Sequence, residues 1–270
     1  RSVVSLVENP PPSPERDDIH TGSYLYIVPN ADGVADAIAP LIEWRRRQGF
    51  NVSLEMVANG AGAGTINDLI EDYYNSAYPV EYVALVGDAA GNIRLSAASQ
   101  FGDYGYTRLD GNDPLPDVAL GRISVSSINE LNRVVNKLVS YESDPYMDDT
   151  DWFKQAASIA GAPVNGLGTV LLAKYVRKEL FDAGYDQVHY WYHNERGILE
   201  GNQQFLTDQF DWGISVMHYR AYSRMNGLSL NIVRNLPGRN GRWAAMVAIS
   251  CNTGTFVTEE SQSEAIFRGR

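Results

Sequence analysis

The chain has 270 residues, and its 22 basic and 33 acidic side chains give a formal net charge of −11. Apolar residues make up 44% and charged residues 20% of the sequence, a composition that is typical of globular proteins and excludes disorder along the whole chain. The acidic balance argues against nucleic acid as a partner, because like charges repel. No apolar run approaches the roughly 18 residues of a transmembrane helix, so we predict no membrane span. The single cysteine excludes an intrachain disulfide.

Residues 1–22 predict an extended lead-in, because four prolines stand beside several charged residues between positions 10 and 18. The chain then alternates between short apolar runs, which predict strands, and segments with helical periodicity. The predicted strands of the first half are 24–29, 50–57, 82–86 and 120–124. The predicted helices are 34–48, 66–76 and 128–141, with Thr65 and Ser127 as N-caps of the second and third.

The same rhythm restarts after a turn-rich linker at 144–150. The predicted strands of the second half are 156–160, 187–192, 213–219 and 243–250, and the predicted helices are 170–183, 205–210 and one that begins at 263–267. Alternating strands and helices with short turns are typical of a mostly parallel sheet covered by helices on both faces. We therefore predict an α/β protein of two similar subdomains, 23–146 and 147–270.

Two strand ends in the second half carry residues with chemical potential. One reads Gly213-Ile-Ser-Val-Met-His-Tyr-Arg-Ala-Tyr-Ser223, and the other Met246-Val-Ala-Ile-Ser-Cys-Asn-Thr-Gly-Thr-Phe256. In α/β sheets, ligands and catalytic groups gather at the carboxyl ends of strands. The pair resembles the gingipain-type cysteine peptidases, relatives of the caspases, in which Tyr-x-Gly-His-Gly carries the catalytic His and Cys-x-x-Gly-x-Phe carries the nucleophile.

Motifs of the first half support this resemblance, namely Val86-Gly-Asp88, Asp103-Tyr104, Leu109-Asp-Gly-Asn-Asp113 and Pro116-Asp-Val-Ala-Leu-Gly-Arg-Ile-Ser124. The resemblance implies a caspase-like fold and a cysteine endopeptidase that hydrolyses peptide bonds through a thiolate. It also implies a peptide or protein as substrate or partner and a place outside or on the surface of a bacterial cell. The family continues beyond the nucleophile, so we expect a further carboxyl-terminal part of the parent polypeptide after Arg270, as a separate chain or segment.

Cys251, Gly254 and Phe256 fall on the nucleophile motif of the family. A lone free cysteine is more often a small buried apolar residue than a nucleophile. The position of Cys251 at a strand end, directly before Asn252, instead predicts an exposed thiol. In an active enzyme the backbone N–H groups of Cys251 and Ser223 would hold the oxyanion.

The motif of the catalytic His is altered. Tyr222 stands at the family's His position, and Ala221 and Ser223 replace the two glycines beside it. The Tyr222 hydroxyl adds no positive charge beside the thiol, so it would donate a hydrogen bond or simply pack as an aromatic ring. The acidic residue of the family would fall near 161–164, where no carboxylate stands.

Two other histidines are candidate bases. His218 lies four residues before Tyr222, roughly 13 Å along a strand, so it would need a bulge or bend to reach Cys251. The alternative is a core histidine with a satisfied hydrogen bond. His193 ends another strand, which should neighbour the others and bring it toward the same edge.

An aspartate-rich loop suggests a structural calcium site, because Ca²⁺ prefers oxygen ligands. Its candidate ligands are Asp103, Asp110, Asp113 and Asp117. The alternative is a solvated acidic loop with Asx turns. Arg122 is expected to pair with one of these aspartates.

The leading functional hypothesis is a gingipain-like cysteine peptidase domain with impaired or altered catalysis. The competing hypothesis is an inactive pseudopeptidase that serves as a binding or scaffold module, with Tyr222 filling the former site. Transfer of the acyl group to an amine is a third possibility that no residue singles out.

Overall fold

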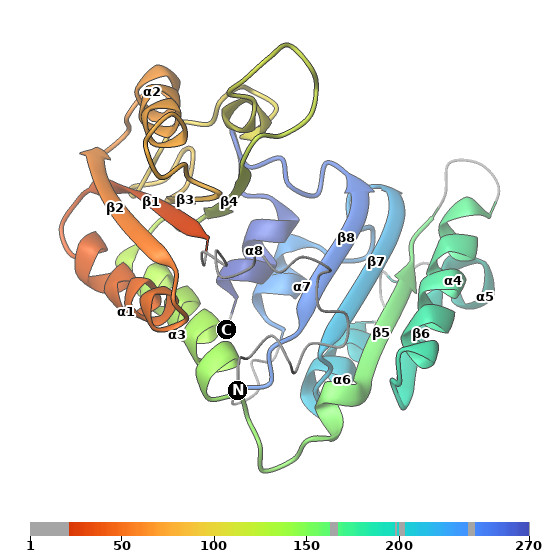
Figure 1. The fold of residues 1–270 in the computed structure, drawn as a ribbon. Helices are drawn as coiled ribbons and strands as arrows, with labels where there is room; N and C mark the ends of the chain where they lie inside the picture. The colour runs from red at the N-terminus through yellow and green to blue at the C-terminus, as the bar shows by residue number, and fades with distance from the viewer. Residues whose placement is uncertain (1–21, 163–166, 198, 200–202, 237–240, 270) are drawn as a thin grey trace, which may run out of the picture.

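The computed structural model describes residues 22–162, 167–197, 199, 203–236 and 241–269 (Figure 1). The predicted lead-in therefore lies outside the described residues, except for Gly22. The first half contains β1 (Ser23–Asn30), α1 (Val34–Arg47), β2 (Asn51–Ala58), α2 (Ala63–Tyr74), β3 (Tyr82–Val86), the 3₁₀ turn η3 (Tyr104–Thr107), β4 (Ala119–Ile123) and α3 (Ile128–Ser143). The second half contains η4 (Asp151–Lys154), β5 (Gln155–Ala160), α4 (Gly168–Asp182), β6 (Gln187–Tyr192), α5 (His193–Arg196), α6 (Gln203–Trp212), β7 (Val216–Ser223), α7 (Leu230–Arg234), β8 (Ala245–Cys251) and α8 (Gln262–Arg268).

Within the described residues the strands form two four-stranded sheets with the same connectivity, β2-β1-β3-β4 and β6-β5-β7-β8. Every pair of neighbouring strands within them is parallel. Figure 1 shows helices against each sheet, as the alternating sequence pattern predicts. The α/β prediction is confirmed. The predicted boundary at residue 146 falls between α3 and η4 and stays a prediction.

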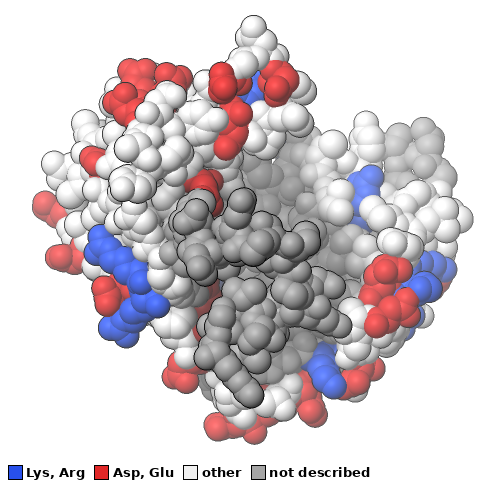
Figure 2. Space-filling view, viewed as in Figure 1, with Lys and Arg blue, Asp and Glu red and all other residues white. Residues whose placement is uncertain are grey.

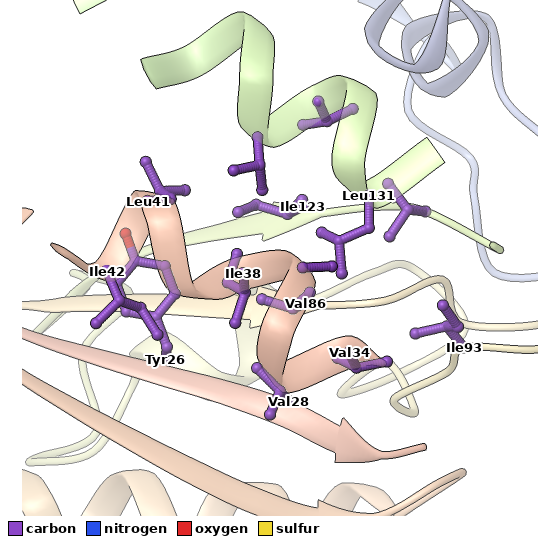
Figure 3. Packing of buried hydrophobic residues seen from close by; sticks show 14 of the residues in the cluster. Tyr26, Val28, Val34, Ile38, Leu41, Ile42, Val86, Ile93, Ile123 and Leu131 are labelled. Atoms are coloured by element: carbon purple, nitrogen blue, oxygen red, sulfur yellow. The ribbon is translucent and has the colours of Figure 1, made fainter. Parts of the chain in front are cut away.

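The first sheet is buried on both faces because its strands alternate apolar side chains between two cores. Tyr26 and Val28 pack with α1 and α3, whereas Leu25 and Ile27 pack with α2 on the other face. Figure 3 shows the first of these cores, where Ile38 of α1 lies over the sheet. In α3 the side chain of Ser127 accepts a hydrogen bond from Glu130 N, so the predicted N-cap is confirmed.

The start of α2 differs from the prediction. The helix begins at Ala63 with Gly62 as its N-cap, so Thr65 lies inside the first turn and not at the cap. The first helical hydrogen bond runs from Ile66 N to Gly62 O. Burial of Ile66 and Ile70 against the sheet fixes the helix, and the small residues before Ile66 allow it to begin earlier.

The second sheet is covered unequally. Met217 and Tyr219 of β7 pack with α6, α7 and α8, whereas α4 covers β5 on the opposite face through Val170 and Ala173. The edge strand β8 is less enclosed, and Val247 remains 52% exposed. The second half therefore leaves one strand of its sheet open beside the residues of chemical interest.

Helix α8 joins the two halves. Its Arg268 is buried and forms ion pairs with Asp88 Oδ2 at 3.0 Å and Glu264 Oε1 at 2.8 Å. Arg268 Nε also donates to the Ser124 carbonyl at 2.9 Å, and Lys137 of α3 donates to the Phe267 carbonyl at 2.8 Å. A helix that follows Cys251 is thus anchored at the carboxyl ends of β3 and β4.

Surface charge is spread over the molecule. Figure 2 shows basic side chains in small groups among acidic ones, including a group over α1. The last turn of α1 carries Arg45, Arg46 and Arg47. Arg45 forms an ion pair with Glu142 of α3, so one arginine of this group links the two helices. Within the described residues no helix has the length and apolar character needed to cross a bilayer.

Candidate active site

The two predicted strand ends lie side by side, because β7 and β8 pair in parallel. Their register matches Arg220 with Ile249 but Ser223 with Cys251. Three steps along β7 thus correspond to two along β8, so β7 contains a bulge. Ser223, and not Tyr222, lies opposite Cys251. β7 also continues four residues beyond its predicted end at 219.

Cys251 is the last residue of β8, and it is free and exposed. Its carbonyl accepts a hydrogen bond from Arg224 N at 2.6 Å. Asn252 follows with a left-handed φ of 60°, a conformation that Asn tolerates better than most residues. The side-chain Nδ2 of Asn252 donates to Ser223 Oγ at 3.2 Å, and Ser250 Oγ donates to the Arg224 carbonyl at 2.8 Å. These contacts hold the turn after Cys251 against the end of β7.

The remaining motif residues extend this turn. Gly254 is exposed, and its carbonyl accepts a hydrogen bond from Phe256 N at 3.0 Å. Thr253 is buried and connects the turn to α8, because Ser263 N donates to the Thr253 carbonyl at 3.1 Å. The predicted oxyanion donors, the N–H groups of Cys251 and Ser223, lie at adjacent strand ends, and their role stays a prediction.

His218 does not lie beside Cys251. Its register partner is Val247, four residues before Cys251, and the bulge in β7 comes after His218 and does not move it. The side chain is buried at 3% exposure, with Nδ1 3.3 Å from Ser158 Oγ and, among the described residues, no hydrogen-bond partner for Nε2. Burial, with a smaller effect from Arg220, lowers the pKa of His218 below its ordinary value. The geometry therefore describes a neutral core histidine.

His193 and Tyr222 lie differently with respect to Cys251: two strands separate β6, which His193 follows, from β8, whereas Tyr222 directly precedes the register partner of Cys251. His193 is the first residue of α5, directly after β6, and the strand order places β5 and β7 between β6 and β8. At about 4.8 Å per strand this separates β6 from β8 by about 14 Å. β6 lies in the same sheet as β7 and β8 but does not neighbour either, and the role of His193 as a base stays a prediction. Tyr222 is 58% exposed, so it is not a buried packing residue.

Gly161, one of the positions 161–164 expected to hold the family's acidic residue, has no room for a side chain. A Cβ atom added at Gly161 would lie 2.6 Å from the hydroxyl oxygen of Tyr219. A carboxylate side chain has no room at this position. Residues 163 and 164 lie outside the described residues.

The four aspartates of the calcium hypothesis do not converge. Asp103 pairs with Arg122, with Oδ2 2.6 Å from Nε, which confirms the predicted partnership of Arg122. The amide N–H groups of Asp110 and Leu109 donate to Asp117 and hold the pKa of its carboxyl below the usual value. Asp110 accepts from Gly111 N, and Asp113 accepts from Leu115 N two residues on, as in an Asx turn. Over the described ranges no group of three or more His, Cys, Asp or Glu side chains could hold a metal. Calcium binding stays a prediction.

Sequence reasoning missed the role of Phe256 in joining the halves. The guanidinium of Arg122 lies over the Phe256 ring, 5.2 Å from its centroid. The same ring lies against Gly102, where an added Cβ would be 3.5 Å away. The motif Cys-x-x-Gly-x-Phe already singled out this aromatic residue. Its partners lie about 130 to 150 positions earlier in the chain, so the sequence alone did not indicate the contact.

Parallel sheets flanked by helices, with a free thiol at the carboxyl end of an edge strand, define a protein of the α/β class with the arrangement expected of a caspase-like fold. The model of peptidase family C25 matches residues 18–269. The chain belongs to this family.

Known relatives come from a bacterium. Gingipain R2 of Porphyromonas gingivalis is 24% identical over 215 residues, which are 76% of this chain and 28% of the relative. Lys-gingipain of the same organism is 31% identical over 138 residues, which are 47% of this chain and 8% of the relative. The chain thus spans well under two thirds of the length of either relative.

Solved structures agree on the fold. A complex of the pro- and mature domains of RgpB of Porphyromonas gingivalis superposes with a TM-score of 0.80 at 21% identity, covering 92% of this chain and 60% of that chain. The Arg-specific cysteine proteinase gingipain R (RgpB) superposes with a TM-score of 0.78 at 20% identity, covering 93% of this chain and 59% of that chain. The predicted caspase-like fold is therefore confirmed.

Proposed function

We propose that this chain is a cysteine endopeptidase domain with impaired catalysis, in which the thiolate of Cys251 attacks the carbonyl carbon of a peptide bond. The supporting observation is the exposed thiol at the carboxyl end of β8, on a turn held by β7, in a member of peptidase family C25. The attack forms a thioester and releases the amine portion with a proton. Water then hydrolyses the thioester and restores the thiol.

The impairment follows from the missing base. A cysteine peptidase uses a neighbouring base to form the thiolate and then to protonate the leaving amine. Tyr222 stands at the family's His position, and the bulge turns Ser223 toward the register position of Cys251. His218 is buried among core residues instead. Hydrolysis is therefore slow, because no neighbouring base takes the proton of the thiol or protonates the leaving amine.

The test compares peptide hydrolysis by the wild-type chain, by Cys251→Ser and by a variant that restores the family's motif, Ala221→Gly/Tyr222→His/Ser223→Gly. We expect slow cleavage by the wild-type chain, no cleavage by Cys251→Ser, and about a hundredfold faster cleavage by the restored variant. Tyr175→His is the matched control, because Tyr175 is similarly exposed, at 59%, on α4. Cleavage that survives Cys251→Ser would overturn the proposal.

A pseudopeptidase is the second candidate. The closed position at Gly161 and the exposed Tyr222 favour it, because both replace groups that the family's chemistry uses. It is distinguished by the pH dependence of Cys251 alkylation by iodoacetamide in the native protein. A midpoint well below about 8.5 supports the peptidase, whereas a midpoint at or above that value supports a binding or scaffold module.

We further propose that the domain works outside or on the surface of a bacterial cell, on a peptide or protein, together with further polypeptide of its parent. The bacterial relatives and the solved complex of pro- and mature domains support this proposal. Immunodetection in fractionated cultures of the source cells tests it. Detection confined to the cytoplasm would contradict the location.

A further inference from the structure

A pocket of about 310 Å³ lies beside the turn that follows Cys251. One wall consists of Ser250, residues 252–255 and Val257, and the other consists of Gln100 and Phe101 from the first half. The pocket therefore spans the two halves and begins at the two chain neighbours of Cys251. A larger cavity of about 580 Å³ lies between α3 and β8 and does not include Cys251 or its turn.

The wall from the first half is a tight turn. Ser99 and Gly102 exchange two backbone hydrogen bonds of 3.1 Å, and Phe101 N donates to Ser99 Oγ at 3.1 Å. Gly102 has a φ of 114°, which a residue with a side chain rarely adopts. The turn leaves the ring of Phe101 89% exposed at the mouth of the pocket.

The two walls are connected through Phe256. Its ring lies between Gly102 and the guanidinium of Arg122, while the chain around it forms the opposite wall. Arg122 is itself fixed by Asp103 and by the carbonyls of Gly87 and Leu95, both at 3.0 Å. The spacing of the walls is therefore set by buried contacts, and the pocket is formed before any ligand binds.

The lining residues offer hydroxyl and amide groups but no charge. They include Ser, Thr, Asn and Gln side chains together with Phe101 and Val257. A side chain with a hydrogen-bonding or apolar surface finds partners there. A charged side chain would lose hydration without gaining an ion pair.

We propose that this pocket binds an uncharged side chain of a peptide whose main chain lies across the Cys251 turn. The proposal rests on the proposed function, because the pocket would hold the side chain that lies next to the peptide bond attacked by Cys251. It sets this chain apart from its structural relative described as Arg-specific. The substrate class is a peptide with a neutral polar or aromatic residue close to the cleaved bond.

The experiment uses short peptidyl chloromethyl ketones that differ at one residue, Gln, Phe, Arg or Glu. The thiolate of Cys251 displaces chloride from each probe and forms a thioether, which intact-mass analysis detects. We expect the Gln and Phe probes to label Cys251 at least tenfold faster than the Arg and Glu probes, after each rate is divided by the probe's rate with free cysteine. Iodoacetamide, which lacks a side chain to bind, reports the reactivity of the thiol itself.

Two variants assign the preference to the pocket. Thr255→Asp places a carboxylate in the exposed part of the lining and should shift the preference at least tenfold toward the Arg probe. Phe101→Ala should reduce labelling by the Phe probe several-fold. Tyr78→Ala is the matched control, because Tyr78 is 80% exposed and precedes β3, at the opposite end of the first sheet.

Equal labelling by all four probes, or a preference that Thr255→Asp leaves unchanged, would overturn the pocket assignment even if iodoacetamide shows a reactive thiol. A thiol that is slow toward iodoacetamide would instead count against the proposed function. In that event, calorimetric binding of the same sequences as peptide amides to Cys251→Ser tests the pocket without the thiol. Binding that does not favour Gln or Phe over Arg and Glu would overturn it.

Discussion

The carboxyl ends of β3 and β4 in the first half carry charged side chains that are held in ion pairs, whereas the corresponding ends of β7 and β8 present an exposed thiol. Asp88 is bonded to Arg268 and Asp103 to Arg122, all with little exposure. At the second edge Cys251 is exposed on a turn with a left-handed residue. The two sheets share one strand order, so the difference lies in the residues and loops that follow the strands. A repeated fold can thus supply anchorage at one edge and chemistry at the other.

The anchorage of the first edge depends most on Arg268. In Arg268→Met, Asp88 and Glu264 lose the buried cation that compensates them, and we expect the free energy of unfolding to fall by about 3–5 kcal/mol. Urea denaturation measures the change. Arg234→Met is the matched control, because Arg234 is 52% exposed and pairs with Glu260, and it should cost less than about 1 kcal/mol. Similar losses in the two variants would contradict the proposed anchorage.

The core of the second sheet should be sensitive to acid through His218. Burial lowers the pKa of His218 below its ordinary value of 6.5. Below that pH the unfolded chain binds a proton at His218 that the folded chain does not, so the free energy of unfolding falls as the pH drops. Above pH 6.5 neither the folded nor the unfolded chain holds a proton at His218, so this residue adds no pH dependence to the free energy of unfolding. The slope from this residue is at most about 1.4 kcal/mol per pH unit.

Urea denaturation between pH 7.5 and 5.0 measures this slope. In His218→Leu the dependence on pH below 6.5 should become flatter than in the wild-type chain, whatever the stability at pH 7.5. His189→Leu is a useful comparison, because burial also lowers the pKa of His189, with a smaller effect from Arg177. An unchanged slope in His218→Leu would show that the folded protein accepts a proton at this site.

The smallest expected effect on stability concerns the turn that follows Cys251. Asn252 has a φ of 60°, so Asn252→Gly should keep the free energy of unfolding within about 0.5 kcal/mol of the wild type, because glycine adopts this conformation freely. Asn252→Ala should cost about 1 kcal/mol more than the glycine variant, owing to the contact of its Cβ with the backbone. Differential scanning calorimetry of the two variants measures the difference. Equal stability would mean that the turn adopts another conformation in solution.

The local sequence pattern was sufficient to predict most of the helices and strands. Strand 187–192 was predicted with its observed bounds, and Ser127 was predicted as an N-cap, since both depend on neighbouring residues. The position of Cys251 at a strand end also followed from a short apolar run. The predicted start of α2 was wrong by three residues, because the small residues Ala63 and Gly64 extend the helix to a cap at Gly62.

The sequence by itself determined the α/β class, the family and the place of the thiol, because periodicity and short motifs carry them. The tertiary structure decided which residues meet. It placed a bulge between Arg220 and Ser223, buried His218 beside Ser158, and selected Asp103 among four aspartates as the partner of Arg122. It also brought Phe256 onto Arg122 and Arg268 onto Asp88. These contacts join residues far apart in the chain, and their geometry follows from how the two sheets and α8 pack, which no local pattern contains.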